Sequence, residues 1–150
     1  MNKNHLQRAL RCGKLTLAAL EATLRLYRQS PDITQAIPTL RAFTRSLDDI
    51  RATGETAAAL LDTALGEEFH IHLEGSTSQI GSGALPTEEL PTFVIAVRHD
   101  KQSANAIAAK FRRANPPILG RIKDDRFLLD LRTIFDPREL IPNFNGADNS

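Results

Sequence analysis

The sequence predicts an α+β fold, in which an N-terminal linking helix precedes a small domain with a mostly antiparallel sheet. Three observations lead to this prediction. Apolar residues recur at helical spacing up to residue 65, they alternate with polar residues from residue 69, and a short polar turn separates two apolar segments near residue 124. Because helices and strands come in blocks, we expect helices on one face of the sheet and a partly polar opposite face.

The first helix is expected from Lys14 to Gln29, within a stretch, residues 6–28, that reads almost entirely as helix. Four large apolar side chains recur along it at helical spacing: Leu17, Leu20, Leu24 and Tyr27. Ser30 and Pro31 end this helix, because proline disfavours helical geometry in the residue before it. Residues 31–43 are expected to form a connector with one short turn after Pro38.

A second helix is expected over residues 47–65, where Ser46 followed by Asp49 resembles a capping box and Gly66 ends the helix. Gly54 in its interior weakens this prediction, since glycine costs about 1 kcal/mol relative to alanine there. The side expected to be buried consists of Leu47, Ile50, Ala57, Leu60, Leu61, Ala64 and Leu65.

Residues 69–74 alternate between apolar and polar side chains and predict a strand. A short strand at residues 78–81 and a loop follow, and residues 92–97 form the most apolar strand. A helix with mixed faces is expected at residues 103–113, and Pro116 and Pro117 break it. Residues 118–122 and 126–131 then predict a hairpin joined by Lys123, Asp124 and Asp125.

Composition limits the classes of function. The 150 residues suit one domain with a helical extension, and the net charge of +1 excludes a strong global field for nucleic acid while permitting a local patch. Cys12 is the single cysteine, so an internal disulfide is excluded. Without a signal peptide or an apolar stretch long enough to span a bilayer, we expect a cytoplasmic protein with no membrane partner.

The chemistry-bearing residues predict no metal site. His70, His72 and Glu74 share one strand face, but a rise of about 3.3 Å per residue places His70 and Glu74 about 13 Å apart, too far to hold one ion. Cys12 lies beside Arg11 without an assignable histidine partner, so we interpret it as a bystander thiol.

Two further segments have weak signals. The glycine- and serine-rich residues 75–86 lack the lysine of a phosphate-binding loop, and we interpret them as a turn and a loop. Five basic residues could form an RNA-binding patch, but no aromatic residues are interleaved with them, so we interpret them as solvated helix and hairpin faces. The five are Arg112, Arg113, Arg121, Lys123 and Arg126.

Several co-linear motifs carry a resemblance to a known family. The stretch "RALRCGKLTLAALEATLRLYR" (8–28) is followed by "AIPTLRAF" (36–43), "GSGALPTEELPTFVIAV" (81–97) and "PPILGRIKDDRFLLDLRTI" (116–134). Together they resemble the bacterial selenocysteine synthase family, L-seryl-tRNA(Sec) selenium transferase, from about Leu6 to Ile134. The family's enzymes are fold-type-I pyridoxal-phosphate enzymes that convert seryl-tRNA(Sec) to selenocysteinyl-tRNA(Sec) with selenophosphate as donor.

The resemblance implies that this chain is the C-terminal part of a longer enzyme. The family's cofactor lysine lies before the "RALR" stretch, so neither Lys3 nor Lys14 matches it, and no catalytic or cofactor-binding residue is expected here. We expect a linking helix and connector at 1–45, a small α+β domain at 46–134 and a C-terminal tail at 135–150. The isolated chain is predicted to be inactive, and the intact enzyme is predicted to be a homo-oligomer.

The resemblance also implies a role for Arg8 and Arg11. In the family the arginines of this "RxxR" motif hold the anionic selenium donor, and guanidinium groups suit phosphate-like oxygens. Arginines three positions apart would lie on one helix side. Cys12 and Gly13 depart from the family's usual residues and break the local continuity. The alternative hypothesis is a self-standing, non-catalytic interaction or RNA-binding domain that retains the fold.

Overall fold

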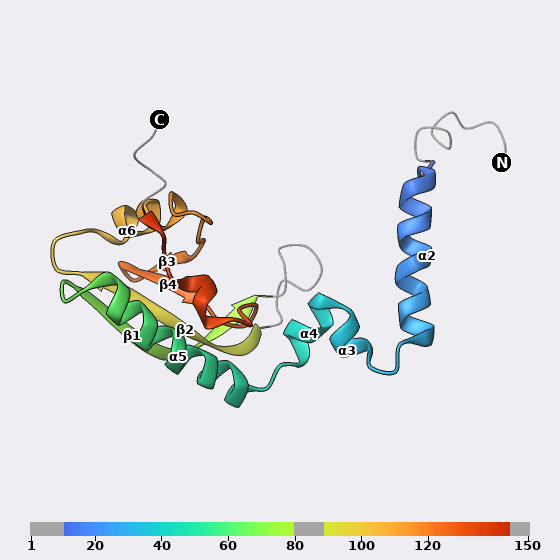
Figure 1. The fold of residues 1–150 in the computed structure, drawn as a ribbon, viewed down its shortest axis with the longest axis horizontal. Coiled ribbons are helices and arrows are strands. Elements are labelled where there is room, and N and C mark those ends of the chain that lie inside the picture. The colour runs from blue at the N-terminus through green and yellow to red at the C-terminus, as the bar shows by residue number, and fades with distance from the viewer. Residues whose placement is uncertain (1–10, 80–88, 145–150) are drawn as a thin grey trace. The chain divides into compact units, whose positions relative to one another are not determined.

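The computed structural model describes residues 11–79 and 89–144, and Figure 1 shows the elements that they form. In chain order these are α2 (Lys14–Gln29), α3 (Ile33–Ala36), α4 (Pro38–Thr44), α5 (Leu47–Leu65), β1 (Phe69–Gln79), β2 (Glu89–His99), α6 (Ala104–Arg112), β3 (Arg121–Lys123), β4 (Arg126–Asp130) and the 3-10 helix η1 (Pro137–Leu140). They make an α+β fold, which confirms the predicted class. The chain divides into two compact units, Met1–Thr44 and Arg45–Ser150.

The first unit is helical. α2 has the predicted bounds, but the expected connector contains two short helices rather than one turn. The carboxylate of Asp32 caps α3, because its Oδ1 accepts hydrogen bonds from the backbone N–H groups of Thr34 (2.9 Å) and Gln35 (3.2 Å). Pro38 begins α4 at the position where a missing N–H costs nothing. Local capping therefore forms structure that helical periodicity alone did not indicate.

The second unit contains a four-stranded sheet in the order β1-β2-β4-β3, with every pairing antiparallel. β1 is a single strand of 11 residues, so the predicted separate strand at 78–81 is wrong as far as Gln79, and residues 80–81 lie outside the described residues. Gly75 and the residues after it form strand rather than the expected turn, because they pair with β2, as in Gly75 opposite Phe93. β2 likewise extends beyond the predicted residues 92–97.

Helices α5 and α6 cover one face of the sheet, as predicted. Their buried side chains share a single core with alternate residues of β2 and β4, and its members include Ile50, Leu61, Ile95, Ile107, Phe111, Phe127 and Leu129. α6 does not mix its faces, because Ala104, Ile107, Ala108 and Phe111 are all buried at helical spacing. On α5, Leu47 and Ala64 are exposed because they lie in its terminal turns, beyond the buried run from Ile50 to Leu61.

Gly54 has a packing reason to be inside a helix. A Cβ atom at this position would lie 2.6 Å from Cδ1 of Leu73, on β1, and 2.6 Å from Cδ1 of Leu131, just after β4. Glycine therefore lets α5 approach the sheet more closely than a residue with a side chain would allow. This close packing explains why a glycine stands inside the helix despite its low helix propensity.

The β3–β4 hairpin closes through a two-residue turn. Asp124 and Asp125 both have positive φ, 51° and 53°, and Lys123 pairs with Arg126 on either side of them. This is the geometry of a type I′ turn, whose twist matches that of the flanking strands. Just before β3, a Cβ atom on Gly120 would lie 2.5 Å from the carbonyl oxygen of Leu128, so the hairpin also depends on a glycine.

The residues that follow β4, as far as Phe144, pack onto the rest of the second unit. Leu140 in η1 is buried, and the ring of Phe144 lies edge-on to that of Phe111 with 5.9 Å between centroids. Asp136 caps η1, and its hydrogen bonds from Arg138 lower the pKa of that carboxyl to about 2. Residues 145–150 of the predicted tail lie outside the described residues. None of the described helices has the length and apolar run that a bilayer crossing requires.

Replacing Gly120 with alanine should destabilise the second unit by about 1–3 kcal/mol, the usual cost of overpacking, because the Leu128 backbone would have to move. Gly75→Ala is the matched control, since a Cβ atom there meets nothing within 4 Å. Urea denaturation of both variants measures the difference. Identical midpoints for Gly120→Ala and the parent protein would contradict this account of the hairpin.

Candidate functional site

Of the two arginines predicted to bind an anion, Arg8 lies outside the described residues and Arg11 is exposed. Residues 11–13 are not helical, so the expectation that helix covers nearly all of residues 6–28 is wrong for Arg11. The reason is local: Gly13 is the N-cap of α2 and has an extended backbone, with φ −67° and ψ 157°. Glycine is also a poor helix former. Arg11 therefore lies just before α2 rather than on one of its sides.

The start of α2 is an electropositive position. The N-cap residue Gly13 has no side chain to cap the first N–H groups of this 16-residue helix, and Lys14 is its first residue. Those N–H groups carry the positive end of the helix dipole. Within residues 11–79 and 89–144, no hydrogen bond or ion pair engages the Arg11 side chain. A guanidinium placed beside a helix N-terminus suits an anion with several oxygens.

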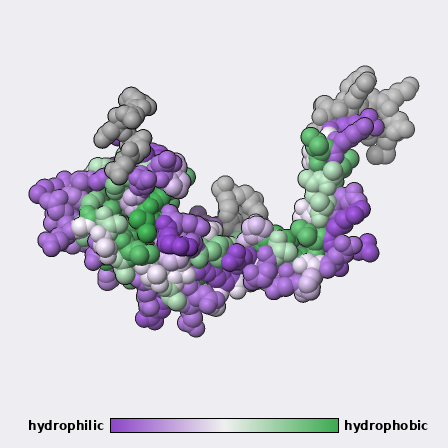
Figure 2. Space-filling view, viewed as in Figure 1, coloured by the Kyte–Doolittle hydropathy of each residue, from purple (hydrophilic) through white to green (hydrophobic). Residues whose placement is uncertain are grey.

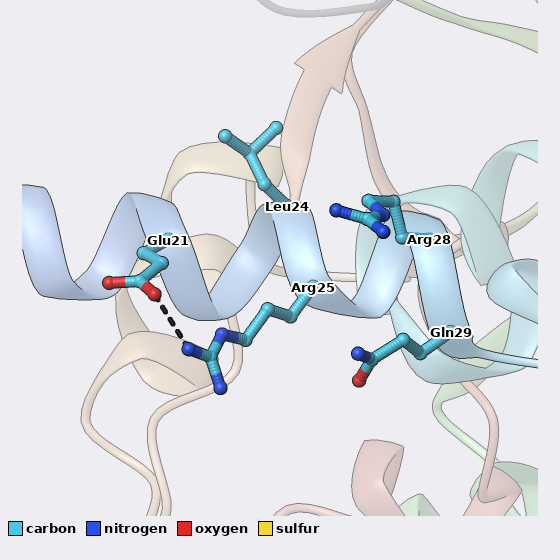
Figure 3. A pocket seen from close by; sticks show the side chains of 5 residues that line it. All are labelled: Glu21, Leu24, Arg25, Arg28 and Gln29. Carbon is cyan, nitrogen blue, oxygen red and sulfur yellow. Dashed lines mark hydrogen bonds and ion pairs between the residues drawn. The ribbon is translucent and has the colours of Figure 1, made fainter.

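A shallow hollow lies on the surface of α2 (Figure 3), lined by Glu21, Leu24, Arg25, Arg28 and Gln29. Arg25 and Glu21 form an ion pair of 2.8 Å, and both side chains are about two-thirds exposed, so it contributes little to stability. All five lining residues belong to one helix, and none is a lysine. This surface therefore lacks both the enclosure and the amine that a covalently held aldehyde cofactor requires.

Of the three potential metal ligands on β1, His70 and Glu74 engage different partners and His72 is exposed. His70 Nε2 lies 2.7 Å from Asp100 Oδ1, and this hydrogen bond lowers the pKa of the Asp100 carboxyl. Glu74 instead accepts a 2.6 Å hydrogen bond from Arg126. In the part of the chain that the structure describes, no three histidine, cysteine, aspartate or glutamate side chains are grouped to hold a metal ion. Cys12 is exposed and its thiol is free.

A polar network lies on the sheet face opposite the helices, centred on Asp130. Its carboxylate accepts hydrogen bonds from Ser78 Oγ (2.6 Å), Thr92 Oγ1 (3.1 Å) and the backbone N–H of Arg132 (3.1 Å). Arg121 Nη1 lies 3.7 Å from Asp130 Oδ2. Ser78, Thr92 and Asp130 were not predicted from the sequence to form a site, and Arg121 was noted only in the basic cluster, because only the strand register brings these residues together. Of these residues, only Ser78 belongs to the alternating polar positions of β1.

Pairing with carboxylates on this sheet face neutralises part of the basic cluster noted in the sequence. Arg121 also donates to Ser76 Oγ and to the Thr77 carbonyl, and Arg126 is paired with Glu74. Two of the five cationic side chains are thus paired with carboxylates in the same sheet, whereas Arg112, Arg113 and Lys123 remain exposed. Cations already neutralised in this way add little attraction for phosphates.

Two arginines that the sequence analysis also missed tie together the chain segments around the sheet. Arg132, only 6% exposed, donates to the Pro91 carbonyl at the start of β2. Arg45 donates to the carbonyls of Leu131 (3.0 Å) and Ile134, and its guanidinium lies 5.0 Å from the centre of the Phe135 ring. Both side chains engage backbone carbonyls, so they act as structural ties and not as a binding site.

Comparison with known proteins gives one consistent result. A family model described as "SelA: L-seryl-tRNA selenium transferase" matches residues 1–135. This chain is 42% identical to the protein named L-seryl-tRNA(Sec) selenium transferase in Edwardsiella ictaluri, 43% identical to that in Moorella thermoacetica and 47% identical to that in Geotalea uraniireducens. These matches cover 94%, 95% and 89% of this chain but 31%, 32% and 29% of the relatives. The chain thus spans about a third of the length of the curated relatives that it matches.

Zinc should leave the melting temperature of this chain unchanged, because Glu74 is held by Arg126 and His70 by Asp100. Thermal unfolding in the presence of zinc and of a chelator measures this directly. His70→Ala, which removes one potential ligand, is the diagnostic variant. A rise in melting temperature with zinc that is lost in His70→Ala would show that these side chains rearrange to bind the metal.

Proposed function

Because the chain belongs to the L-seryl-tRNA selenium transferase family, we propose that it is the C-terminal part of an enzyme that makes selenocysteinyl-tRNA(Sec) from seryl-tRNA(Sec). Selenophosphate is the proposed selenium donor. The observation that carries the proposal is the match of the family model to residues 1–135, together with relatives 42–47% identical over nearly the whole chain. Acting on a charged tRNA, the intact enzyme would work in the cytoplasm, and we propose that it is a homo-oligomer.

In this proposal Arg8 and Arg11 bind the anionic donor. Three features of Arg11 support the role: it is exposed, it has no ion pair among the described residues, and it precedes the N-terminus of α2, where the N-cap residue Gly13 has no capping side chain. The helix dipole and the guanidinium favour the same ligand, an anion with several oxygens. The two arginines would hold and orient the donor, leaving the chemistry of the seryl group to residues outside this chain.

The family's chemistry also implies pyridoxal phosphate, and the described residues do not fit this cofactor. Lys101 pairs with Glu68 at 2.9 Å and is largely exposed. The ammonium of Lys110 lies over the rings of Phe69 and Phe144, at 5.4 and 4.5 Å from their centres. Lys14 and Lys123 are exposed. We therefore propose that the cofactor is attached outside this chain and that the chain alone is inactive.

Arg8→Ala and Arg11→Ala should each reduce donor-dependent turnover of the intact enzyme by about one to two decades. A charge-assisted hydrogen bond contributes about 1.5–3 kcal/mol, and this loss applies at low donor concentration. Lysine at either position should restore only part of the rate, because it keeps the charge but loses the planar fork. The measurement is steady-state turnover at varied selenophosphate with seryl-tRNA(Sec) saturating. A suitable enzyme is the Moorella thermoacetica relative with its matched third replaced by this chain.

Arg51→Ala is the matched control, because Arg51 is an exposed arginine paired with Glu55 on α5. It should turn over like the parent at every donor concentration. If Arg8→Ala and Arg11→Ala behave like Arg51→Ala, the two arginines are a polar surface and the donor binds elsewhere. If instead the isolated chain binds tRNA(Sec) tightly and the chimeric enzyme is inactive, the alternative of a non-catalytic RNA-binding domain is favoured.

A further inference from the structure

α2 presents a continuous apolar surface that no other described residue buries. Leu17, Leu20, Leu24 and Tyr27 follow a 3-4-3 spacing, the pattern of a helix that packs along one partner helix or groove. Each of these four side chains is 53–55% exposed, and no residue of α2 is buried. Figure 2 shows the hydrophobic surface along one side of α2 and hydrophilic surface on the other. We call these four residues the α2 seam.

We propose that the α2 seam docks onto the part of the family's polypeptide that this chain does not contain, in an apolar groove with an acidic rim. About two-thirds of each relative's length lies outside the region matched here. The family model includes the whole of α2, so this helix belongs to the family's fold. The inference depends on family membership alone and is independent of the proposed roles of Arg8 and Arg11.

The size of the α2 seam favours a tethered partner over a second copy of this chain. With about half of a large side chain's roughly 200 Å² left exposed, four residues offer about 400 Å². Two such faces bury about 800 Å², which is below the roughly 1,200 Å² of a stable complex but within the 600–1,500 Å² typical between domains of one chain. A covalent link supplies the effective concentration that so small an interface needs.

The charges beside the α2 seam also disfavour pairing with a second copy. An antiparallel pair that sets Leu20 against Leu24 brings the two Glu21 side chains together across the seam. A parallel pair sets Glu21 and Arg28 against threonines and gains no ion pair. By contrast, Lys14 and Arg28 border the seam without an ion pair among the described residues, whereas Arg25 and Glu21 neutralise each other, so an acidic rim on the partner would be attracted.

Hydrogen exchange tests the proposal. In the isolated 150-residue chain, the amides of residues 14–29 should exchange with little protection, because a helix of this length without packing is marginal in water. In the intact Moorella thermoacetica relative, the matching segment should be protected at least about 100-fold more. Equal protection in both proteins would overturn the proposal: if both are slow, the helix is packed within this chain, and if both are fast, it has no partner.

Charge substitutions identify the surface. In the chimeric enzyme described above, Leu20→Glu should abolish the extra protection of residues 14–29. Leu15→Glu should leave it intact, because Leu15 is 88% exposed and lies off the seam. Equal effects of the two variants would overturn the proposal. So would a concentration-dependent dimer of the isolated chain that Leu20→Glu dissociates and Leu15→Glu does not, because the occupant would then be a second copy. The exchange comparison needs no chimera, so it stands if the chimera does not fold.

Discussion

The second unit depends on how closely α5 approaches its sheet. At Gly54 the helix backbone comes so near to Leu73 and Leu131 that a single added carbon would lie 2.6 Å from each. This contact holds β1 and the segment after β4 against the same helix, and the strands between them, β2 and β4, supply the centre of the core. Arg45 and Arg132 reinforce the arrangement by donating to carbonyls at the ends of β2 and β4. Among the described residues, the core of this unit is built from residues 50–144.

Local signals in the sequence predicted the three longer helices, α2, α5 and α6. Ser46 accepts from the Asp49 N–H at the start of α5, and Ser103 does the same for Ala106 at the start of α6. Features that arise from pairing could not be predicted in this way. β1 continues through Gly75 because β2 lies beside it, and Asp130 meets Ser78 and Thr92 only through the strand register. Likewise, η1 packs onto the domain through Leu140, whose neighbours are distant in sequence.

The candidate site illustrates a different limit. Composition and spacing alone identified no reactive group, and the roles of Arg8 and Arg11 came from the resemblance to a family. The structure adds that Arg11 precedes α2 instead of lying along it, which no helical periodicity could indicate. It also separates the charges: residues 1–44 carry 7 basic and 2 acidic side chains, whereas the rest of the chain carries 12 and 16. Attraction for anions is therefore concentrated in the helical unit and not in the sheet domain.

Together these features describe a self-contained sheet domain joined to a basic helix whose apolar side requires the rest of the family's polypeptide. The most direct test is the thermal unfolding of residues 45–150 compared with that of the whole chain. Because residues 45–150 keep every member of the sheet core and both structural arginines, and lose only the buried Ala42, their melting temperature should differ from that of the whole chain by less than about 4 °C, the shift that about 1 kcal/mol produces in a domain of this size. A fragment that fails to fold, or that melts far lower, would contradict this account.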